Sequence, residues 1–307
     1  MRIVSLLPAA TEVVHALGLG DHLVGRSHEC DHPAGVEDLP VVSRPRAPMT
    51  GDSATIDRDV RALVRDGGGV FEIDPDVLAE LAPDVVITQS ACEVCAVDAS
   101  VVHAALLDTA GADTTVVDLQ PSRLTEVLDD HRRIAAALGV PQRGEELVAA
   151  LEARLAAVAD AVAGRPRPTV GTVEWFDPLI AAGTWLPDLV VHAGGEPALS
   201  AAGGHAPVVA IEDLVAADPD VLLLAPCGFT VERALEELPA LAGQPGWEAL
   251  RAPRQGRAWV VDGHELVNRP GPRLVDTVEL LAHLLHPQAV ARAAAPHLAV
   301  PVTTVPR

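Results

Sequence analysis

Cysteine is the residue type with the most distinctive chemistry in this chain, at Cys30, Cys92, Cys95 and Cys227. Cys92 and Cys95 form a Cys-x-x-Cys pair, a spacing that lets two thiolates reach one metal ion. Soft thiolate ligands suit zinc, copper(I) or an iron–sulfur cluster, and Cys30 and Cys227 would complete a set of four. The sequence therefore predicts a metal site made by Cys30, Cys92, Cys95 and Cys227. The alternative is a set of buried, reduced cysteines with an incidental pair.

A second group of side chains is suited to holding a small ligand. Glu29 and Glu93 each adjoin a loop cysteine, and their carboxylates would ligate a metal, hold a ligand amide or remain solvated. Tryptophan rings offer faces for flat ligands, although packing against a core is the alternative. The arginines in this group would bind an anionic or amide-bearing ligand. The predicted ligand contacts are Glu29, Arg44, Gln89, Glu93, Glu174, Trp175, Trp185, Asn268 and Arg269.

Alternating strands and helices must position these side chains. In the first half of the chain, apolar runs and glycine breaks predict strands over 2–7, 22–26, 84–88 and 114–117, and helices over 11–17, 75–81 and 100–107. Such alternation favours a parallel sheet covered by helices on both faces. Ligands of these sheets bind beyond the carboxyl ends of the strands. Since Cys30, Cys92 and Cys227 each follow a predicted strand, we expect the cysteines to lie at that edge.

Two helical stretches divide the chain into two lobes. The predicted helices cover 122–138 and 143–162, and a second α/β pattern follows with strands at 169–173, 220–224 and 257–261 and a final helix at 273–285. We predict an N-terminal α/β lobe over 1–140, a spine helix over 141–165, a C-terminal α/β lobe over 166–286 and a mobile Ala/Pro-rich tail over 287–307.

The two lobes also resemble each other in sequence. The run PDVVIT at 83–88 leads to Cys92, and the run PDVLLL at 219–224 leads to Cys227. The segment VVHALG at 13–18 has a counterpart in VVHAGG at 190–195. Because both matches fall at equivalent places in the predicted lobes, we expect a pseudo-symmetric pair of domains that face each other.

Composition excludes several classes of function. The formal net charge of −21 has the wrong sign for a nucleic-acid-binding surface. The chain contains neither lysine nor tyrosine, which rules out Schiff-base lysines, a P-loop lysine and tyrosine acid–base chemistry. We find no Ser–His–Asp signature and no Gly-x-Ser-x-Gly elbow, so nucleophilic catalysis has no positive support.

The first residues do not form an export signal. The apolar run at 2–7 is interrupted by Pro8 and Glu12, and no apolar run approaches membrane-spanning length. The sequence therefore predicts a cytoplasmic protein without membrane insertion, in which the thiols are reduced.

Residues 2–12, RIVSLLPAATE, together with the Pro-Asp-Val strand openings and the spine helix, resemble the cobalamin-type, class III substrate-binding proteins of ABC transporters. The resemblance covers about residues 1–286. It implies two Rossmann-like α/β lobes joined by a rigid helix, limited hinge closure and a corrinoid or iron-chelate ligand. The segments 25–31, 92–97, 225–229 and 268–273 resemble a leaderless branch commonly labelled cobalamin-binding.

The first functional hypothesis is a cytoplasmic protein that binds a cobalamin-like corrinoid, or another small molecule or metal chelate, in the cleft between the lobes. The missing export signal argues against an ABC permease as its partner. The rival hypothesis is a metalloenzyme with a Cys-ligated zinc or iron–sulfur centre between the lobes. A third is a transport receptor whose start codon is misassigned.

Overall fold

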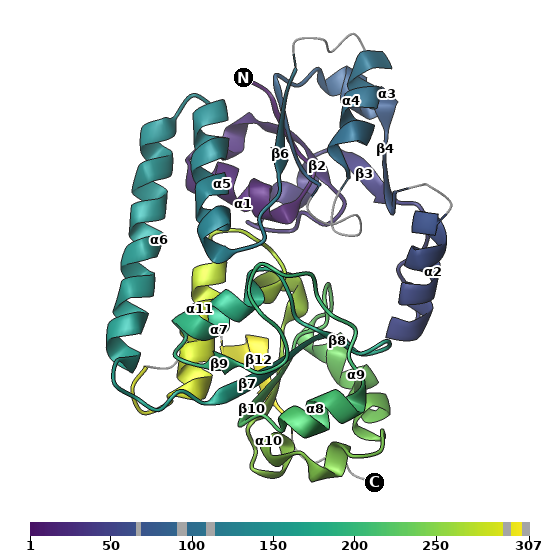
Figure 1. The fold of residues 1–307 in the computed structure, drawn as a ribbon. Coiled ribbons are helices and arrows are strands. Elements are labelled where there is room, and N and C mark those ends of the chain that lie inside the picture. Colours follow the sequence, from purple (N-terminus) through teal and green to yellow (C-terminus); the bar gives the residue numbers. More distant parts are fainter. Residues whose placement is uncertain (66–68, 91–96, 109–113, 291–295, 303–307) are drawn as a thin grey trace. The chain divides into compact units, whose positions relative to one another are not determined.

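The computed structural model describes residues 1–65, 69–90, 97–108, 114–290 and 296–302. The chain divides into two compact units. The first contains residues 1–51, 55–121 and 125–150, and the second contains 52–54, 122–124 and 151–307. Each unit is built on a sheet of mainly parallel strands with helices around it (Figure 1). The two-unit α/β fold expected from the sequence is confirmed.

The sheet of the first unit has the strand order β4-β3-β2-β1-β5-β6. All neighbouring strands are parallel except β3 and β4. The strands are β1 (Ile3–Ser5), β2 (Leu23–Ser27), β3 (Val41–Pro45), β4 (Phe71–Ile73), β5 (Val85–Gln89) and β6 (Thr115–Leu119). The helices along this part of the chain are α1 (Pro8–Ala16), α2 (Ser53–Arg65), α3 (Pro75–Leu81), α4 (Ala99–Asp108) and α5 (Leu124–Ala137).

Helices cover both faces of this first sheet because successive residues of a strand point to opposite sides. Ile3 of β1 belongs to a buried cluster with Val13 and Val14 of α1. The next residue, Val4, belongs to a separate cluster with Leu78 of α3. The continuous apolar run in β1 therefore marks a strand that is buried on both faces.

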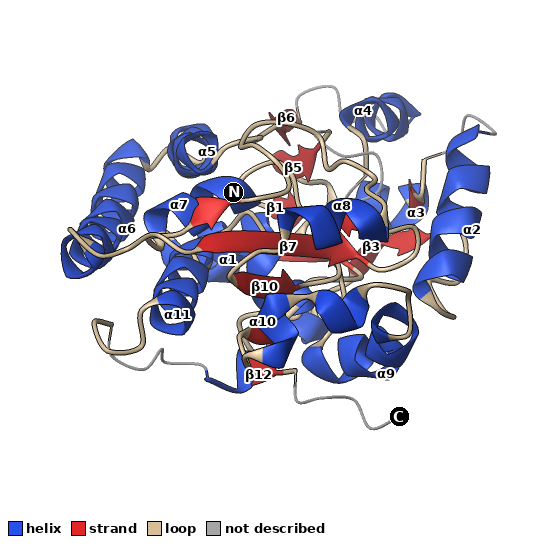
Figure 2. Ribbon diagram, turned by 60° about the horizontal axis from the view of Figure 1, so that its bottom comes forward, coloured by secondary structure: helices blue, strands red, loops and turns tan. Residues whose placement is uncertain are grey.

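The second unit has the strand order β12-β11-β10-β7-β8, and β9 also pairs with β7. Figure 2 labels β7, β10 and β12 of this sheet. Strands β7, β10 and β11 are parallel to one another, whereas β8 and β12 are antiparallel to their neighbours. The strands are β7 (Thr169–Trp175), β8 (Ile180–Ala181), β9 (Glu196–Pro197), β10 (Val221–Leu224), β11 (Ala258–Val261) and β12 (Ala299–Pro301). The helices are α7 (Leu186–His192), α8 (Ile211–Ala217), α9 (Val231–Ala242), α10 (Arg251–Arg254) and α11 (Leu274–Leu285).

Helix α6 (Pro141–Val162) is the predicted spine helix. Its residues up to 150 belong to the first unit and its residues from 151 to the second, so the chain passes from one unit to the other within this helix. Short 3-10 helices occupy Gly20–His22, Val36–Asp38, Trp247–Ala249 and Pro296–Leu298, and a π-helical turn occupies Gly263–Val267. Across the described ranges, no helix combines the length and the apolar character needed to cross a membrane.

The end of the chain differs from the prediction. The sequence predicts a mobile tail from residue 287, but Ala299–Pro301 form β12, which pairs with β11 and is the edge strand of the second sheet. A strand of this length cannot show the alternation of polar and apolar residues by which strands are recognised.

The internal sequence match at 83–88 and 219–224 corresponds to a repeated structural unit. Helices α3 and α8 both end at a non-glycine residue with left-handed backbone, Ala82 with φ 40° and Asp218 with φ 33°. Each is followed by a Pro-Asp dipeptide and then by β5 or β10, which pair with β1 and β7 respectively. The second match falls on α1 and α7, which are the first helix after β1 and the first helix after β7.

Candidate functional site

The carboxyl ends of β7, β10 and β11 form the candidate site in the second unit, since ligands of parallel α/β sheets bind at this edge. Backbone hydrogen bonds join the three ends. The N–H of Cys227 donates to the carbonyl of Glu174 at 2.9 Å, and the N–H of Gly228 donates to the carbonyl of Gly263 at 3.3 Å. The N–H of Gly263 donates to the carbonyl of Phe229 at 2.9 Å. The loop after β10 is therefore fixed between the ends of β7 and β11.

Gly263 allows the loops after β10 and β11 to approach closely. A Cβ atom at this position would lie 2.0 Å from the carbonyl oxygen of Pro226, so no side chain fits there. The π-helical turn that begins at Gly263 is closed by Asp262, whose carboxylate accepts from the N–H groups of His264 at 2.9 Å and Glu265 at 2.5 Å. Such turns are frequent at functional sites.

Asn268 has a structural role at this edge. Its side-chain NH₂ donates to the carbonyl oxygens of Ala225 at 3.3 Å and Gly263 at 3.1 Å. Its amide donors therefore hold the loop after β10 against the loop after β11. The structure thus shows that the amide nitrogen of Asn268 binds the backbone, and the predicted ligand contact of Asn268 stays a prediction.

Glu174, at the carboxyl end of β7, has an unusually basic carboxyl group. Burial raises its pKa to about 7, because removal from water disfavours the ionised form. The N–H of Gly183 donates to Glu174 Oε2 at 3.2 Å and partly opposes this rise in pKa. Near neutral pH this carboxyl group is therefore available both as a proton donor and as an acceptor.

Trp175 follows Glu174 and lies against an aromatic neighbour. Its ring centroid is 5.2 Å from that of Phe229, at an interplanar angle of 59°. The guanidinium carbon of Arg233 lies 4.9 Å from the centre of the Phe229 ring, a cation–π arrangement. The indole N–H of Trp175 lies within hydrogen-bonding distance of the carbonyls of Ser53, at 3.2 Å, and Asp177, at 3.1 Å.

Trp185 belongs to the core of the second unit. Only 8% of it is exposed, and its indole N–H donates to the carbonyl of Val267 at 3.0 Å. The stacking role predicted from the sequence is therefore replaced by packing, because a flat ligand needs an accessible ring face.

Arg269 is also buried, with 7% of its surface exposed. One of its guanidinium nitrogens lies 3.0 Å from Nε2 of His264. A guanidinium group only donates, so Nε2 of His264 accepts and the proton of the neutral ring sits on Nδ1. Arg269 thus fixes the tautomer of a histidine in the π-helical turn, directly beyond β11.

In the first unit, Cys30 lies past the carboxyl end of β2, as expected from the sequence. Its side chain is 1% exposed. The hydroxyl of Thr11 lies 3.1 Å and that of Ser27 lies 3.2 Å from Cys30 Sγ. The thiol therefore sits in a buried pocket of hydroxyl groups, whereas Cys227 in the second unit is exposed.

Glu29 and Gln89 differ in their access to water. The Glu29 side chain is 48% exposed and lies 3.9 Å from Nε2 of His28. Burial lowers the pKa of His28, and the nearby Glu29 partly opposes that effect. Gln89 ends β5 and is 3% exposed.

Arg44 lies on β3 opposite Glu72 of the antiparallel strand β4. Its guanidinium group forms an ion pair with Glu72 at 2.6 Å. The cross-strand partner, which the sequence analysis missed, gives Arg44 a role within the sheet, and its predicted ligand contact stays a prediction.

Cys92, Glu93 and Cys95 lie outside the described residues, so the four-cysteine site stays a prediction. Within the parts of the chain that the structure describes, no group of three or more His, Cys, Asp or Glu side chains could hold a metal ion. A thiolate-bound zinc or iron–sulfur centre has no support from these parts.

The sequence analysis missed Phe229, Asp262 and Gly263 at this edge. The position of Asp262-Gly263 directly after the predicted strand at 257–261 was a usable signal, because a glycine at a strand end often permits close approach of backbones. No comparable signal existed for Phe229, whose role depends on the ring of Trp175, far away in the sequence.

Three comparisons place the chain among known proteins. The family model described as "Periplasmic binding protein" matches residues 3–264. The uncharacterized ABC transporter substrate-binding lipoprotein YvrC of Bacillus subtilis is 25% identical over 296 residues, which cover 93% of this chain and 80% of that protein. The vitamin B12-binding protein of Vibrio cholerae is 24% identical over 289 residues, which cover 91% of this chain and 86% of that protein.

Among solved structures, a periplasmic heme binding protein from Pseudomonas aeruginosa matches with a TM-score of 0.72 and 26% sequence identity. The match covers 100% of this chain and 99% of that chain. The similarity in sequence and in fold thus extends through both units.

Proposed function

Because this chain belongs to the periplasmic binding protein family, we propose that it binds a metal-containing macrocycle, a corrinoid or a heme, through the loops at the carboxyl ends of its parallel strands. It is a substrate-binding protein of the ABC-transporter type. The vitamin B12-binding relative and the heme-binding structural neighbour support this ligand class. The observation that carries the proposal is the junction of Glu174, Trp175 and Cys227 at one edge of the second sheet.

Each of these three residues suits a different part of such a ligand. The indole ring of Trp175 offers a surface for a flat macrocycle. Glu174, with its pKa near 7, would hydrogen-bond to the polar groups on the rim of the macrocycle. The exposed thiol of Cys227 is a soft donor for the central metal. Since the chain contains no tyrosine, an axial protein ligand to heme iron would come from Cys, His or Met.

Binding of this kind needs no reaction at the site. Glu174 and Trp175 would orient the ligand, and the backbone junction between the loops would keep the two side chains in place. The metalloenzyme hypothesis has no comparable observation among the described residues. The cytoplasmic location and the lack of a permease partner stay predictions, which cell fractionation and co-purification would test.

The decisive experiment is a titration of the reduced protein with aquocobalamin and, separately, with hemin. Tryptophan fluorescence and the visible spectrum of the ligand report binding. We expect saturable binding of one of the two ligands at micromolar concentrations, weakened in Trp175→Phe. The buried Trp247→Phe is the matched control and should bind like the wild type. Absence of saturable binding by either ligand would refute the proposal.

The Cys227→Ser variant tests the role of the thiol separately. If Cys227 donates to the ligand metal, the substitution changes the visible spectrum of the bound ligand, because a hydroxyl is a harder and weaker donor. An unchanged spectrum with unchanged affinity would leave the ligand class intact and remove Cys227 from the site.

A further inference from the structure

Five residues of the second unit form a closed cycle of contacts around Trp175. The indole N–H of Trp175 donates to the carbonyl of Ser53 at 3.2 Å. The N–H of Ser53 donates to Glu237 Oε2 at 2.9 Å, and Glu237 Oε1 accepts from Arg233 at 2.5 Å. Arg233 lies over the ring of Phe229, and that ring packs against Trp175, which closes the cycle.

Ser53 is the link between the two halves of this cycle. It is 3% exposed, and its two backbone polar groups are bound by different side chains, the N–H by Glu237 and the carbonyl by Trp175. Ser53 is also the first residue of α2, where backbone N–H groups have no partner within the helix. The carboxylate of Glu237 therefore fixes the backbone of Ser53, and the fixed carbonyl of Ser53 in turn orients the indole.

Glu237 and Arg233 lie on α9, one turn apart. Glu237 is connected to the indole through Ser53, and Arg233 through Phe229. The Glu237 side chain is only 10% exposed, so its contact with Arg233 is shielded from water. Its neighbour Glu236 also binds Arg233, at 3.0 Å, but is 69% exposed and makes no hydrogen bond to Ser53. Glu237 therefore belongs to the cycle, whereas the adjacent Glu236 contacts Arg233 but not Ser53.

We propose that Glu237 and Arg233 are positioning residues that set the orientation of the Trp175 ring, and through it the affinity for the ligand. The inference rests on the proposed function, in which Trp175 contacts a macrocycle. Loss of Glu237 frees the backbone of Ser53, so the indole retains the carbonyl of Asp177 but loses its fixed partner at Ser53. Loss of a hydrogen bond of this kind corresponds to a roughly three- to tenfold weaker affinity for the ligand.

The test uses full-length protein labelled with 5-fluorotryptophan. The chain has four tryptophans, and comparison with Trp175→Phe assigns the ¹⁹F resonance of Trp175. In the ligand-free protein we expect Glu237→Ala to shift or broaden the Trp175 resonance and leave the other three in place. Glu236→Ala, the matched control, should leave all four unchanged. An unchanged Trp175 resonance in Glu237→Ala would overturn the proposal.

Two further variants separate positioning from general loss of structure. Ser53→Pro removes the N–H that Glu237 accepts, at a helix position where proline is well tolerated. It should shift the Trp175 resonance as Glu237→Ala does. The double variant Ser53→Pro, Glu237→Ala should shift this resonance by no more than either single variant. Glu237→Gln keeps an oxygen that accepts from Ser53 and should restore part of the wild-type signal. Additive shifts in the double variant would contradict the cycle.

Affinity is then measured for whichever of aquocobalamin and hemin binds the wild type. We expect Glu237→Ala to weaken binding about three- to tenfold and Glu236→Ala to leave it unchanged. Equal affinity of both variants would overturn the coupling to the ligand. If neither ligand binds the wild type, the proposed function fails, and the ¹⁹F spectra of the ligand-free protein still decide on the positioning of Trp175.

Discussion

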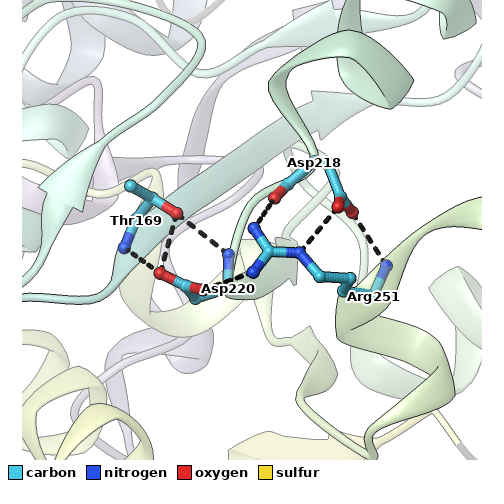
Figure 3. Close-up of polar contacts among 4 residues, drawn as sticks. All are labelled: Thr169, Asp218, Asp220 and Arg251. Atoms are coloured by element: carbon cyan, nitrogen blue, oxygen red, sulfur yellow. Dashed lines mark hydrogen bonds and ion pairs between the residues drawn. The ribbon is translucent and has the colours of Figure 1, made fainter.

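Asp84 and Asp220 occupy equivalent positions in the two units. Each lies directly before the strand that neighbours the first strand of its unit, and each carboxylate accepts the backbone N–H at the start of that first strand. The donor is Arg2 for Asp84, at 2.7 Å, and Thr169 for Asp220, at 2.9 Å. Asp220 also binds the hydroxyl of Thr169 at 3.0 Å and the guanidinium of Arg251 at 3.1 Å (Figure 3). The Pro-Asp repeat therefore anchors the amino end of both sheets.

Replacing these aspartates should destabilise the units to different extents. We expect Asp220→Ala to lower the free energy of unfolding by about 2 kcal/mol and Asp84→Ala by about 1 kcal/mol, because Asp220 makes more hydrogen bonds. Urea denaturation followed by circular dichroism measures both. Asp160→Ala, on the exposed side of α6, serves as the control and should change little. An equal or larger loss in Asp84→Ala would show that the additional bonds of Asp220 contribute nothing.

The buried carboxyl of Glu174 should make stability depend on pH. Its pKa rises from an ordinary 4.5 to about 7 on folding, so between these values the folded protein binds more protons than the unfolded chain. The stabilising contribution of the protonated group is present below pH 4.5 and is lost as the pH rises through about 7. Glu174→Gln should therefore match the wild type near pH 4 and exceed its free energy of unfolding by on the order of 3 kcal/mol at pH 8. Melting curves at the two pH values check this, and equal gains at both would contradict it.

The two described cysteines should differ in reactivity. Cys227 is exposed, whereas Cys30 is buried beside the hydroxyls of Thr11 and Ser27. In the reduced native protein, iodoacetamide should alkylate Cys227 roughly ten times faster than Cys30, since burial of Cys30 blocks access to its thiol. Peptide mass spectrometry after timed quenching gives both rates, and in urea the rates should converge. Comparable rates in the native protein would show that the pocket around Cys30 opens readily.

Gly263 should be intolerant of any side chain. Gly263→Ala would place Cβ against the Pro226 carbonyl, so the loops after β10 and β11 must separate. We expect a loss of about 2–3 kcal/mol in the free energy of unfolding and weaker ligand binding. Gly204→Ala is the control, because a Cβ there meets its nearest neighbour at an ordinary 3.5 Å. A Gly263→Ala protein as stable as the wild type would mean that this close approach is easily relieved.

The main elements of both sheets could be predicted from the sequence because their strands are short apolar runs set between helices. Val85–Gln89 and Val221–Leu224 are buried throughout and flanked by Pro-Asp, so the pattern and its repeat were visible. The prediction missed α2, whose apolar positions Ile56, Val60 and Val64 are separated by charged residues. It also missed β3 and β4, which are short and carry the Arg44–Glu72 pair on an edge of the sheet.

The location of the candidate site was predictable, but the environment of its side chains was not. The carboxyl-end rule predicts Glu174, Trp175 and Cys227 at strand ends; Glu174 and Trp175 are the last two residues of β7, and Cys227 lies in the loop after β10. Whether a side chain in such a loop faces solvent or the core depends on partners that are distant in sequence. Trp185 is buried, and its indole N–H donates to the carbonyl of Val267. The thiol of Cys30 lies among hydroxyls from α1 and β2.

The position of β12 has a consequence for synthesis of the chain. Every strand of the first sheet lies within residues 3–119, so this sheet can form while the rest of the protein is still being made. The second sheet instead takes its edge strand from Ala299–Pro301, which follow β11 (Ala258–Val261) only after α11. Until Ala299–Pro301 have been synthesised, β11 presents an unpaired edge on which other chains can dock, so the nascent second unit is exposed to aggregation for longer than the first.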